Sequence, residues 1–543
     1  VAFGLGTETR VYVLSQHVRQ DNTPDGGIPA VGRAGYSVIP SYTSGGVTTE
    51  NDATHALADA INRAPAVDRE NFYGYTGDNE DVDADMLTVR VEHDLSPTTV
   101  IRNITRAGTT QMDRVLSGSN SPAVNANTTN PANALYLDPN NPAAWGFTPN
   151  RQRVDRTDDI LTNQTSFNST IAAGGVEHAL TGGVEFIYER QKSVNYNANA
   201  VTINGVSYAA TINPEASFYA PNPDVVRGIP NPTGVTTDGD TSTAAVYLFD
   251  SVELNPQWIL SAGFRYESYE TETESTALTN NVVTLNAPLS DDDNLFGWKV
   301  GAVYKPVENG SVYASFATSQ TPPGSANFAL SATANNQNNS ALDPQETDNV
   351  ELGTKWQLFD EMLNLSAAVF RTENSKQASF DDLGNALQIG RTRVEGIEIA
   401  AVGQITNFWQ LSAGITKMDV DVLDQQNSGG VETVGVRWTP ELSATLWTSY
   451  TAGAFTVGGG ARYMGEQDRN VTASTAPSNG VAAIPSYWVA DAMAAYRVNA
   501  ELNLRLNLYN LTDEEYIETL NNGGNRLRMG QPRSVWLTGE YRF

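Results

Sequence analysis

The chain has no cysteine among its 543 residues, and only 17% of them are charged. Without cysteine, neither a disulfide framework nor a thiolate metal site can form. No segment approaches the roughly 18 to 20 consecutive apolar residues of a membrane-spanning helix. The chain is therefore neither a disulfide scaffold nor a helical membrane protein, and its composition fits an oxidising compartment such as the periplasm or the cell surface.

Basic residues are also scarce. Lysine and arginine number 33 against 62 aspartates and glutamates, which gives a formal charge of −29 and argues against a nucleic-acid partner. The four histidines are scattered, and no His-Glu-x-x-His or Gly-x-Ser-x-Gly motif occurs. We therefore expect no enzyme, no catalytic residue, no resident cofactor and no metal site.

Apolar residues recur at every second position along many segments. Every second residue of 502–508 is leucine, with Asn503, Arg505 and Asn507 between them. A helix would place Leu502 and Leu504 on nearly opposite sides, so this segment is predicted to be a two-faced strand. The same alternation occurs in 87–92, 409–416, 442–447 and 534–543.

When many strands each carry one polar face, that face must be in contact with water. A transmembrane β-barrel meets this requirement, because lipid covers its outside and water fills its lumen. The mean hydropathy of −0.35 does not contradict it, since alternation cancels in any average. Length alone would suggest roughly three or four soluble domains. No linker-like change of composition divides the chain, so we predict one all-β domain over 1–543, a transmembrane antiparallel β-barrel.

Connections between the expected strands alternate in length. Short turns lie near Ser96, Gly174, Asn255, Asn309 and Asp360, with others further on, and long Asn-, Thr- and Pro-rich connections lie between them. Membrane barrels have short turns on one rim and long external loops on the other. Nine long connections and eight turns predict about 18 complete strands. Because a barrel starts and ends on the same rim, we expect this chain to begin inside its barrel, with both edge strands unpartnered.

The first long connection contains a helical pattern over 52–64. Asn51 or Asp52 is the expected N-cap, and Pro65 ends the segment. We expect a short surface helix there.

Three motifs, in order, carry a family resemblance. They are Leu342-Asp-Pro-Gln-Glu346 with Val350-Glu-Leu-Gly-Thr-Lys355, then Arg393-Val-Glu-Gly-Ile-Glu398, and last Asn510-Leu-Thr-Asp-Glu-Glu-Tyr516 with Gly530-Gln-Pro-Arg533 and the terminal Tyr-Arg-Phe543. Together they resemble TonB-dependent outer-membrane receptors. The segments 23–29, 67–74 and 317–330 are similar to the catecholate-siderophore group of that family, and the resemblance extends along the whole chain.

The resemblance implies an outer-membrane receptor that imports ferric catecholate siderophores by TonB-coupled transport, without a cofactor. Its family members have 22 strands and an N-terminal plug that meets the TonB-ExbB-ExbD complex. The plug and about the first four strands are expected to be absent here. The resemblance also implies that the barrel-assembly machinery reads Tyr541 and Phe543. The acidic bias leaves open a salty habitat or divalent bridging to lipopolysaccharide.

Ferric catecholates are large, anionic and aromatic, so arginine and aromatic side chains on the external loops are candidate contacts. Loop packing and solvation are the alternative roles. The candidates are Arg33, Tyr36, Arg69, Tyr73, Tyr75, Trp145, Tyr219 and Arg227.

Other charged runs are predicted to be structural. Arg391, Arg393, Glu395 and Glu398 are expected to form ladders facing the lumen and the plug. The run Asp78–Asp85 and the triplet Asp291–Asp293 are expected to be solvated acidic loops rather than Ca²⁺ sites, since neither matches an EF-hand loop. The alternative function, from another class, is a passive porin-type barrel.

Overall fold

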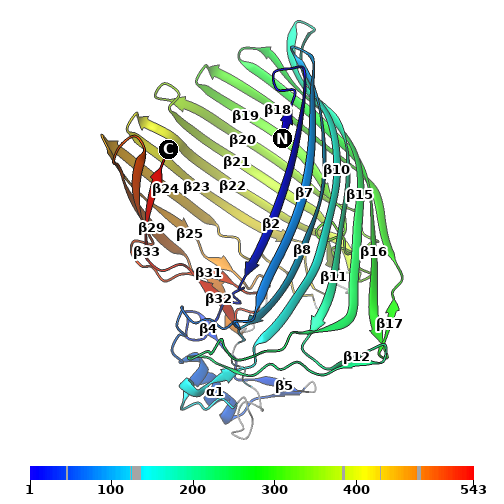
Figure 1. The fold of residues 1–543 in the computed structure, drawn as a ribbon, viewed down its shortest axis with the longest axis vertical. Helices are drawn as coiled ribbons and strands as arrows, with labels where there is room; N and C mark the ends of the chain where they lie inside the picture. Colours follow the sequence, from blue (N-terminus) through cyan, green and yellow to red (C-terminus); the bar gives the residue numbers. More distant parts are fainter. Residues whose placement is uncertain are drawn as a thin grey trace.

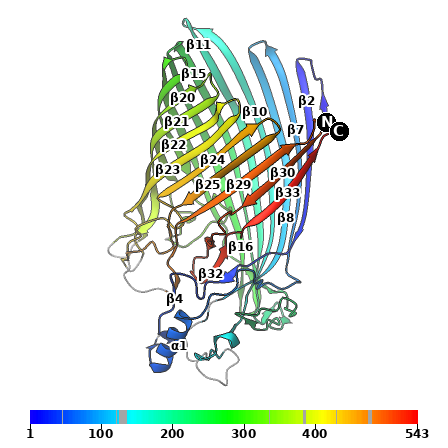
Figure 2. The same ribbon diagram turned by 90° about the vertical axis from the view of Figure 1, so that its left-hand side faces the viewer.

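The structure is a computed structural model that describes residues 1–44, 47–120, 122, 124, 136–334, 336–381, 386–427, 430–473 and 479–543. In these residues one antiparallel sheet of 20 strands forms a strongly curved wall (Figures 1 and 2). No helix in the described ranges is long and apolar enough to cross a membrane. The all-β prediction is confirmed.

The wall strands follow one another around the sheet in chain order. They are β1 (Ala2–Phe3), β2 (Thr9–Asn22), β7 (Asn79–Ser96), β8 (Thr99–Gly118), β10 (Asn150–Ala173), β11 (Val176–Asn197), β15 (Asn231–Asn255), β16 (Trp258–Thr279), β17 (Val282–Leu285), β18 (Leu289–Val307), β19 (Gly310–Thr321), β20 (Gln345–Leu358), β21 (Leu363–Phe380), β22 (Ala386–Thr406), β23 (Trp409–Leu423), β24 (Leu442–Ala452), β25 (Phe455–Met464), β29 (Tyr487–Arg497), β30 (Leu502–Tyr509) and β33 (Ser534–Tyr541).

Beyond one rim lie the shorter elements. They are β3 (Ile28–Pro29), β4 (Tyr36–Ser37), β5 (Tyr42–Ser44), β6 (Val47–Thr49), α1 (Asp52–Asn62), the 3-10 turn η2 (Pro142–Ala144), β9 (Gly146–Phe147), β12 (Val201–Ile203), β13 (Val206–Tyr208), β14 (Ala216–Ser217), β26 (Gln467–Asp468), β27 (Gly480–Val481), β28 (Ala483–Ile484), β31 (Ile517–Leu520) and β32 (Arg526–Met529).

The two rims differ as expected. Figure 1 shows short turns along the upper rim, while α1, β4, β31 and β32 lie beyond the lower one. The predicted helix is confirmed as α1. Its N-cap is Asn51, whose side chain accepts from Thr54 N while Asn51 N donates to Thr54 Oγ1, a reciprocal capping box.

The wall does not close. In the described residues β33 pairs only with β30, β1 pairs only with β2, and no pairing joins the two edges (Figure 1). The expected open seam is therefore present.

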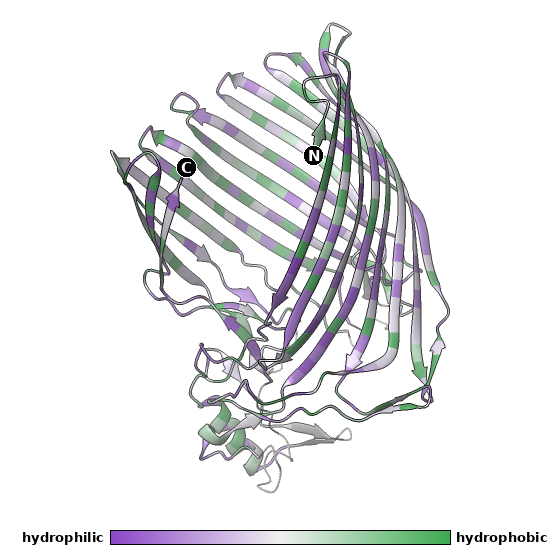
Figure 3. Cartoon of the chain, in the orientation of Figure 1, coloured by the Kyte–Doolittle hydropathy of each residue, from purple (hydrophilic) through white to green (hydrophobic). Residues whose placement is uncertain are grey.

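The two faces of the wall carry different residues, as Figure 3 shows by the alternating colours along each strand. We call the face with Val184, Phe186, Leu506 and Leu537 the outer face. These side chains are exposed, Leu537 by 74%, which suits contact with lipid. The opposite, lumenal face carries ion pairs, among them Glu185 with Arg265 at 2.7 Å. The prediction that the leucines of β30 avoid a closed core is confirmed.

One predicted orientation is wrong. The register places Arg391, Arg393 and Glu395 on the outer face, in the same row as the exposed Ile397 and Ile399, and only Glu398 of that set on the lumenal face. Arg393 pairs with Asp421 at 2.5 Å. The physical reason is strand length: a transmembrane strand needs about 9 to 11 residues, whereas β22 has 21. Its distal part lies past the lipid, where outer-face positions are polar.

The acidic runs are also not loops. Residues 79–96 form β7, and 289–307 form β18, so both runs are mostly strand. Asp78, just before β7, is buried. Its carboxylate accepts from Ser117 N and pairs with Arg151, which explains why a carboxylate is tolerated there.

Replacing Leu506 by Arg should impair membrane insertion, whereas Asn507→Arg should not. Leu506 lies on the outer face, where a cation in lipid costs about 2–4 kcal/mol at mid-membrane depth, and Asn507 lies on the lumenal face of the same strand. Cold electrophoresis of membranes from cells that make each variant measures the amount of heat-modifiable protein. Equal loss in both variants would contradict the assigned faces.

Candidate functional site

The long connections fold together into an apolar cluster beyond the rim of the wall, which we call the cap. Its largest fully buried side chains include Trp145, Tyr73, Phe218 and Leu57. Its buried members are Ile28, Ala30, Val31, Tyr36, Val38, Leu57, Ala58, Ile61, Ala64, Val67, Tyr73, Val124, Leu137, Trp145, Phe147, Ala216, Phe218, Val481, Ile484, Ile517, Leu520 and Leu527. The external loops thus have a hydrophobic core of their own.

Short strand pairings fasten the cap together from distant parts of the chain. β3 pairs with β32, which also pairs with β31, so the first and last long connections share one small sheet. β4 pairs with β27, and β9 pairs with β14. Because β3 follows β2 and β32 precedes β33, this sheet links the loop ends of the two strands at the open seam.

The predicted aromatic candidates are mostly part of this core. Tyr36, Tyr73 and Trp145 are buried in the cap, and Tyr219 packs against it while donating its hydroxyl to Pro65 O. Tyr73 donates to Phe218 O at 2.5 Å, and its ring lies 5.7 Å from that of Phe147. The structure therefore brings four of the predicted aromatics together, in positions that also stabilise the loops.

Burial changes the acidity of two of these phenols. It raises the pKa of Tyr73 to about 12, and it raises the pKa of Tyr219 to about 12 as well. Both hydroxyls are therefore neutral donors at physiological pH.

Arg33 and Arg69 connect the first long connection to the last one. Arg33 donates to Val67 O at 2.7 Å and lies 3.5 Å from the Glu515 carboxylate, and Arg69 lies 3.4 Å from Asp513. A hydrogen bond from the backbone N–H of Arg533 lowers the pKa of Asp513, and the side-chain hydrogen bond from Arg69 lowers it further. In the described residues, Arg33 Nε and Arg69 Nη1 have no hydrogen-bond partner. Both nitrogen atoms are buried, so they are not open to a ligand in this structure.

Tyr75 and Arg227 belong to a separate buried polar network beside the cap core. Its centre is the Arg151–Asp78 ion pair, at 2.5 Å with side chains 1% and 0% exposed. Arg151 also donates to Gly228 O and Ser117 Oγ, and its guanidinium lies 5.7 Å from the Tyr75 ring. Arg227, itself buried, donates to Asn213 Oδ1 at 2.8 Å and to Pro214 O. Desolvation lowers the pKa of Arg227, and its contacts hold the loops in place.

The sequence reading missed two features of this region. The Arg151–Asp78 pair has no local signal, because its members are 73 positions apart. On the lumenal side, Tyr487 and Tyr516 stack with ring centroids 4.3 Å apart, and Arg462 donates to the Tyr516 hydroxyl. Tyr516 belongs to a motif noted in the sequence, but its partners come from β25 and β29.

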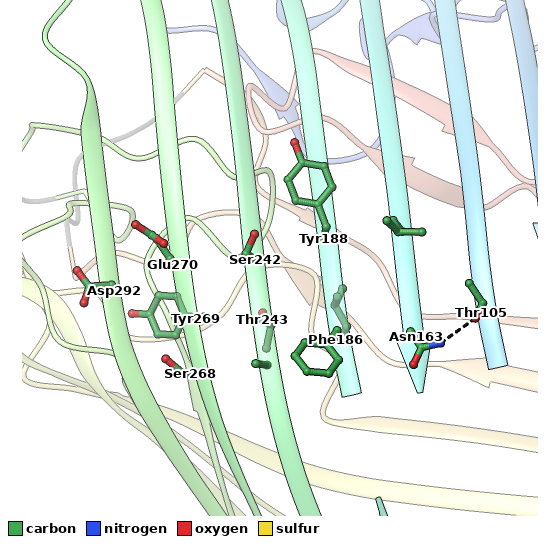
Figure 4. Close-up of a pocket in the computed structure, with 13 residues that line it drawn as sticks. Thr105, Asn163, Phe186, Tyr188, Ser242, Thr243, Ser268, Tyr269, Glu270 and Asp292 are labelled. Carbon is green, nitrogen blue, oxygen red and sulfur yellow. Dashed lines mark hydrogen bonds between the residues drawn. The ribbon is translucent and has the colours of Figure 1, made fainter. Parts of the chain in front are cut away.

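A hollow of about 750 Å³ lies on the outer face (Figure 4). Phe186, Tyr188 and Leu161 line it beside small residues of β15 and β16. Its polar members Asn163 and Thr105 hydrogen-bond each other at 2.7 Å. Since this hollow faces away from the lumen and the cap, it is not on a route through the barrel.

Metal-binding side chains do not gather in the part of the chain that the structure describes, where no group of three or more His, Asp or Glu is placed to hold an ion.

Alkaline pH should loosen the cap through Tyr73. Its phenol ionises near pH 10 when unfolded and near pH 12 when folded, so the unfolded state loses its proton first. Stability conferred by this residue is complete below about pH 10 and falls by about 2–3 kcal/mol by pH 12. Proteolysis of the loops across this range should show the decline. Tyr73→Phe should lower cap stability at neutral pH but flatten the alkaline decline, and an unchanged decline would contradict the assignment.

Comparison with known proteins identifies the fold. The family model described as "TonB dependent receptor-like, beta-barrel" matches residues 17–511. The catecholate siderophore receptor Fiu of Escherichia coli K12 is 36% identical over 565 aligned residues, covering 100% of this chain and 69% of Fiu. The probable TonB-dependent siderophore receptor PiuA of Acinetobacter baumannii is 28% identical over 543 residues, covering 95% of this chain and 65% of PiuA.

Solved structures agree. The closed form of the ferric-catecholate import receptor Fiu from Escherichia coli K12 superposes with a TM-score of 0.86 at 34% identity, covering 100% of this chain and 73% of that one. The siderophore receptor PiuA from Acinetobacter baumannii gives 0.76 at 26% identity, covering 99% of this chain and 73% of PiuA. The chain belongs to the TonB-dependent receptor β-barrel family.

Proposed function

We propose that this protein imports ferric catecholate siderophores across the outer membrane by TonB-dependent transport. The observation that carries the proposal is its likeness to Fiu along its whole length, in sequence and in fold. As a member of its family the chain is an outer-membrane transport protein and not an enzyme. The porin alternative is not favoured, because the relatives are receptors.

The chemistry of the cap supports an anionic, aromatic ligand. Arg33 and Arg69 bring two guanidinium charges to the cap, paired at 3.5 Å with Glu515 and at 3.4 Å with Asp513, and such cations favour an anionic ligand. Of the other candidates, Tyr75 and Tyr219 are partly exposed and offer aromatic surface, whereas Tyr36, Tyr73 and Trp145 are buried in the cap and support it from within. Arg227 is the weakest candidate, since its contacts are with loop carbonyl and amide groups.

The remaining elements of the proposal concern the receptor as a whole. We place this chain as about 18 strands of a 22-stranded barrel whose plug, not among the described residues, meets the TonB-ExbB-ExbD complex. The open edges at β1 and β33 support a closure by further strands. The barrel-assembly machinery inserts the barrel, lipopolysaccharide and outer-membrane lipids surround it, and no cofactor takes part.

The double variant Arg33→Ala with Arg69→Ala should raise the half-saturating concentration for ferric-catecholate uptake at least about tenfold. A lost charge-assisted contact costs about 1.5–3 kcal/mol. The matched control is Arg63→Ala, which removes an exposed cap arginine at the end of α1. Radiolabelled iron uptake beside surface quantification measures the effect. Unchanged uptake would remove both arginines as contacts, and uptake without TonB would refute the transport proposal.

Deleting Phe543, or replacing it by Ser, should reduce receptor in the outer membrane. Phe543 is fully exposed at the end of the chain and Tyr541 lies on the outer face of β33, so both side chains are accessible to the assembly machinery. Pulse-labelled insertion measures this, with Arg542→Ser as the control for the neighbouring position. Normal insertion without Phe543 would contradict the signal role.

A further inference from the structure

The hollow of about 750 Å³ on the outer face extends across the wall from β8 to β18 (Figure 4). Its middle is formed by small side chains of β15 and β16, whereas Phe186 and Tyr188 on β11 are exposed by 59% and 36%. Most of the lining residues fall in two neighbouring cross-strand rows, one of Thr105, Asn163, Phe186, Ala244 and Ser268, the other of Leu161, Tyr188, Ser242, Glu270 and Asp292. The hollow is therefore a groove that runs across the strands.

The boundary of the lipid crosses this groove obliquely. On β18 the exposed apolar residues of the outer face end at Phe296, whereas on β11 they continue to Tyr188. The row of Phe296 meets β11 at Val184, so the boundary moves from Val184 to Tyr188 between these two strands. Strands of membrane barrels tilt by about 35–45°, which produces such an offset. The β18 end of the groove therefore lies level with the lipid head groups, and the β10 end lies among the acyl chains.

The head-group end of the groove carries two carboxylates that lack a cation. Glu270 and Asp292 are directly opposite each other and exposed, and no ion pair among the described residues includes either of them (Figure 4). On β11, Arg190 pairs with Asp238 at 2.5 Å, and Lys192 lies opposite that same aspartate. Like charges directly opposite each other destabilise a sheet. This end of the groove therefore favours a bound cation.

The acyl-chain end of the groove is polar although it lies in lipid. Asn163 Nδ2 donates to Thr105 Oγ1 at 2.7 Å, and Asn103 Nδ2 donates to Thr165 Oγ1 at 2.7 Å and to Asn163 Oδ1 at 3.2 Å. An amide oxygen can accept two hydrogen bonds, and among the described residues Asn163 Oδ1 accepts only this one. It can therefore accept another from a hydroxyl or amide N–H at this depth, where polar groups otherwise find few partners.

We propose that this groove binds a lipid of the outer leaflet whose head group carries a primary amine. The amine pairs with Glu270 and Asp292, and an acyl chain descends over Ala244 and beside Phe186 toward Asn163. A purely anionic head group is disfavoured, because the two carboxylates repel it. The site needs only the outer-membrane location of the family and is independent of which ligand the receptor transports.

A second copy of the chain fits the same groove less well. A two-fold symmetric contact places the same patch on both partners, so Glu270 and Asp292 of each copy would face those of the other. Like-charge contacts of this kind oppose association. The charge of the groove therefore selects a cationic lipid head group over self-association.

Native mass spectrometry of the intact receptor in detergent tests the site, with dioleoyl phosphatidylethanolamine and dioleoyl phosphatidylglycerol as probes. The amine-bearing lipid should bind more tightly. Glu270→Gln with Asp292→Asn should weaken its binding roughly three- to tenfold, to the level of the glycerol lipid. The matched control is Glu395→Gln with Asp419→Asn, which removes two carboxylates that lie opposite each other on the outer face of β22 and β23. Ala244→Phe, which fills the groove, should weaken binding of the amine-bearing lipid as well.

Each contrary outcome refutes the site in its own way. Equal binding of the two lipids, or equal loss in the carboxylate variant and its control, would show that the amine is not recognised. Loss in Ala244→Phe without loss in the carboxylate variant would show that the groove binds acyl chains by shape alone. A lipid-free pair of receptors that Ala244→Phe separates would show that a second copy covers the groove. Iron uptake is not the readout, so failure of the transport proposal would leave these results unchanged.

Discussion

Backbone hydrogen bonding between neighbouring antiparallel strands is the interaction on which the whole molecule depends. In lipid no water is available to an unpaired N–H or C=O, so every strand inside the membrane needs a partner on both sides. In the described residues every long wall strand between the two edges pairs with a neighbour on both sides, and only the two edges lack a partner. At these edges the cap supplies a connection. β3 and β32 pair just beyond β2 and β33, so one small sheet in water links the ends of two wall strands that do not pair with each other.

The cap therefore does more than link strand ends, because it is a packed unit. It has a buried aromatic core and an ion pair, Arg151–Asp78, that is almost fully excluded from solvent. Removing either member of such a pair leaves an uncompensated buried charge and costs about 3–5 kcal/mol. This buried core supports the surface on which Arg33 and Arg69 lie, so binding of the ligand proposed above would lose less conformational entropy there.

Much of this could be predicted from the sequence, because alternation, turn residues and helix caps are local signals. The leucines of β30, the connections between strands and the Asn51 cap of α1 were all readable in this way. What could not be read was the pairing of residues distant in sequence. Asp78 looked like part of a solvated loop because its partner Arg151 lies on another strand.

Orientation failed for a different reason. Arg391, Arg393 and Glu395 were assigned to the lumen on the rule that charge faces water, and that rule specifies a face only within the lipid. Past the lipid both faces of the strand are in water. There the face of each residue follows from the alternation that continues along β22 from Ile397.

The strands that extend past the lipid, such as the 25-residue β15, each have one part in lipid and one part in water. Their lipid-embedded parts depend on apolar contacts, on which added salt has little effect. Their distal parts carry outer-face ion pairs such as Arg393–Asp421 and Arg190–Asp238, which salt screens over about 8 Å at physiological ionic strength. A change in the salinity of the surroundings therefore acts on one end of each strand and leaves the other end unaffected.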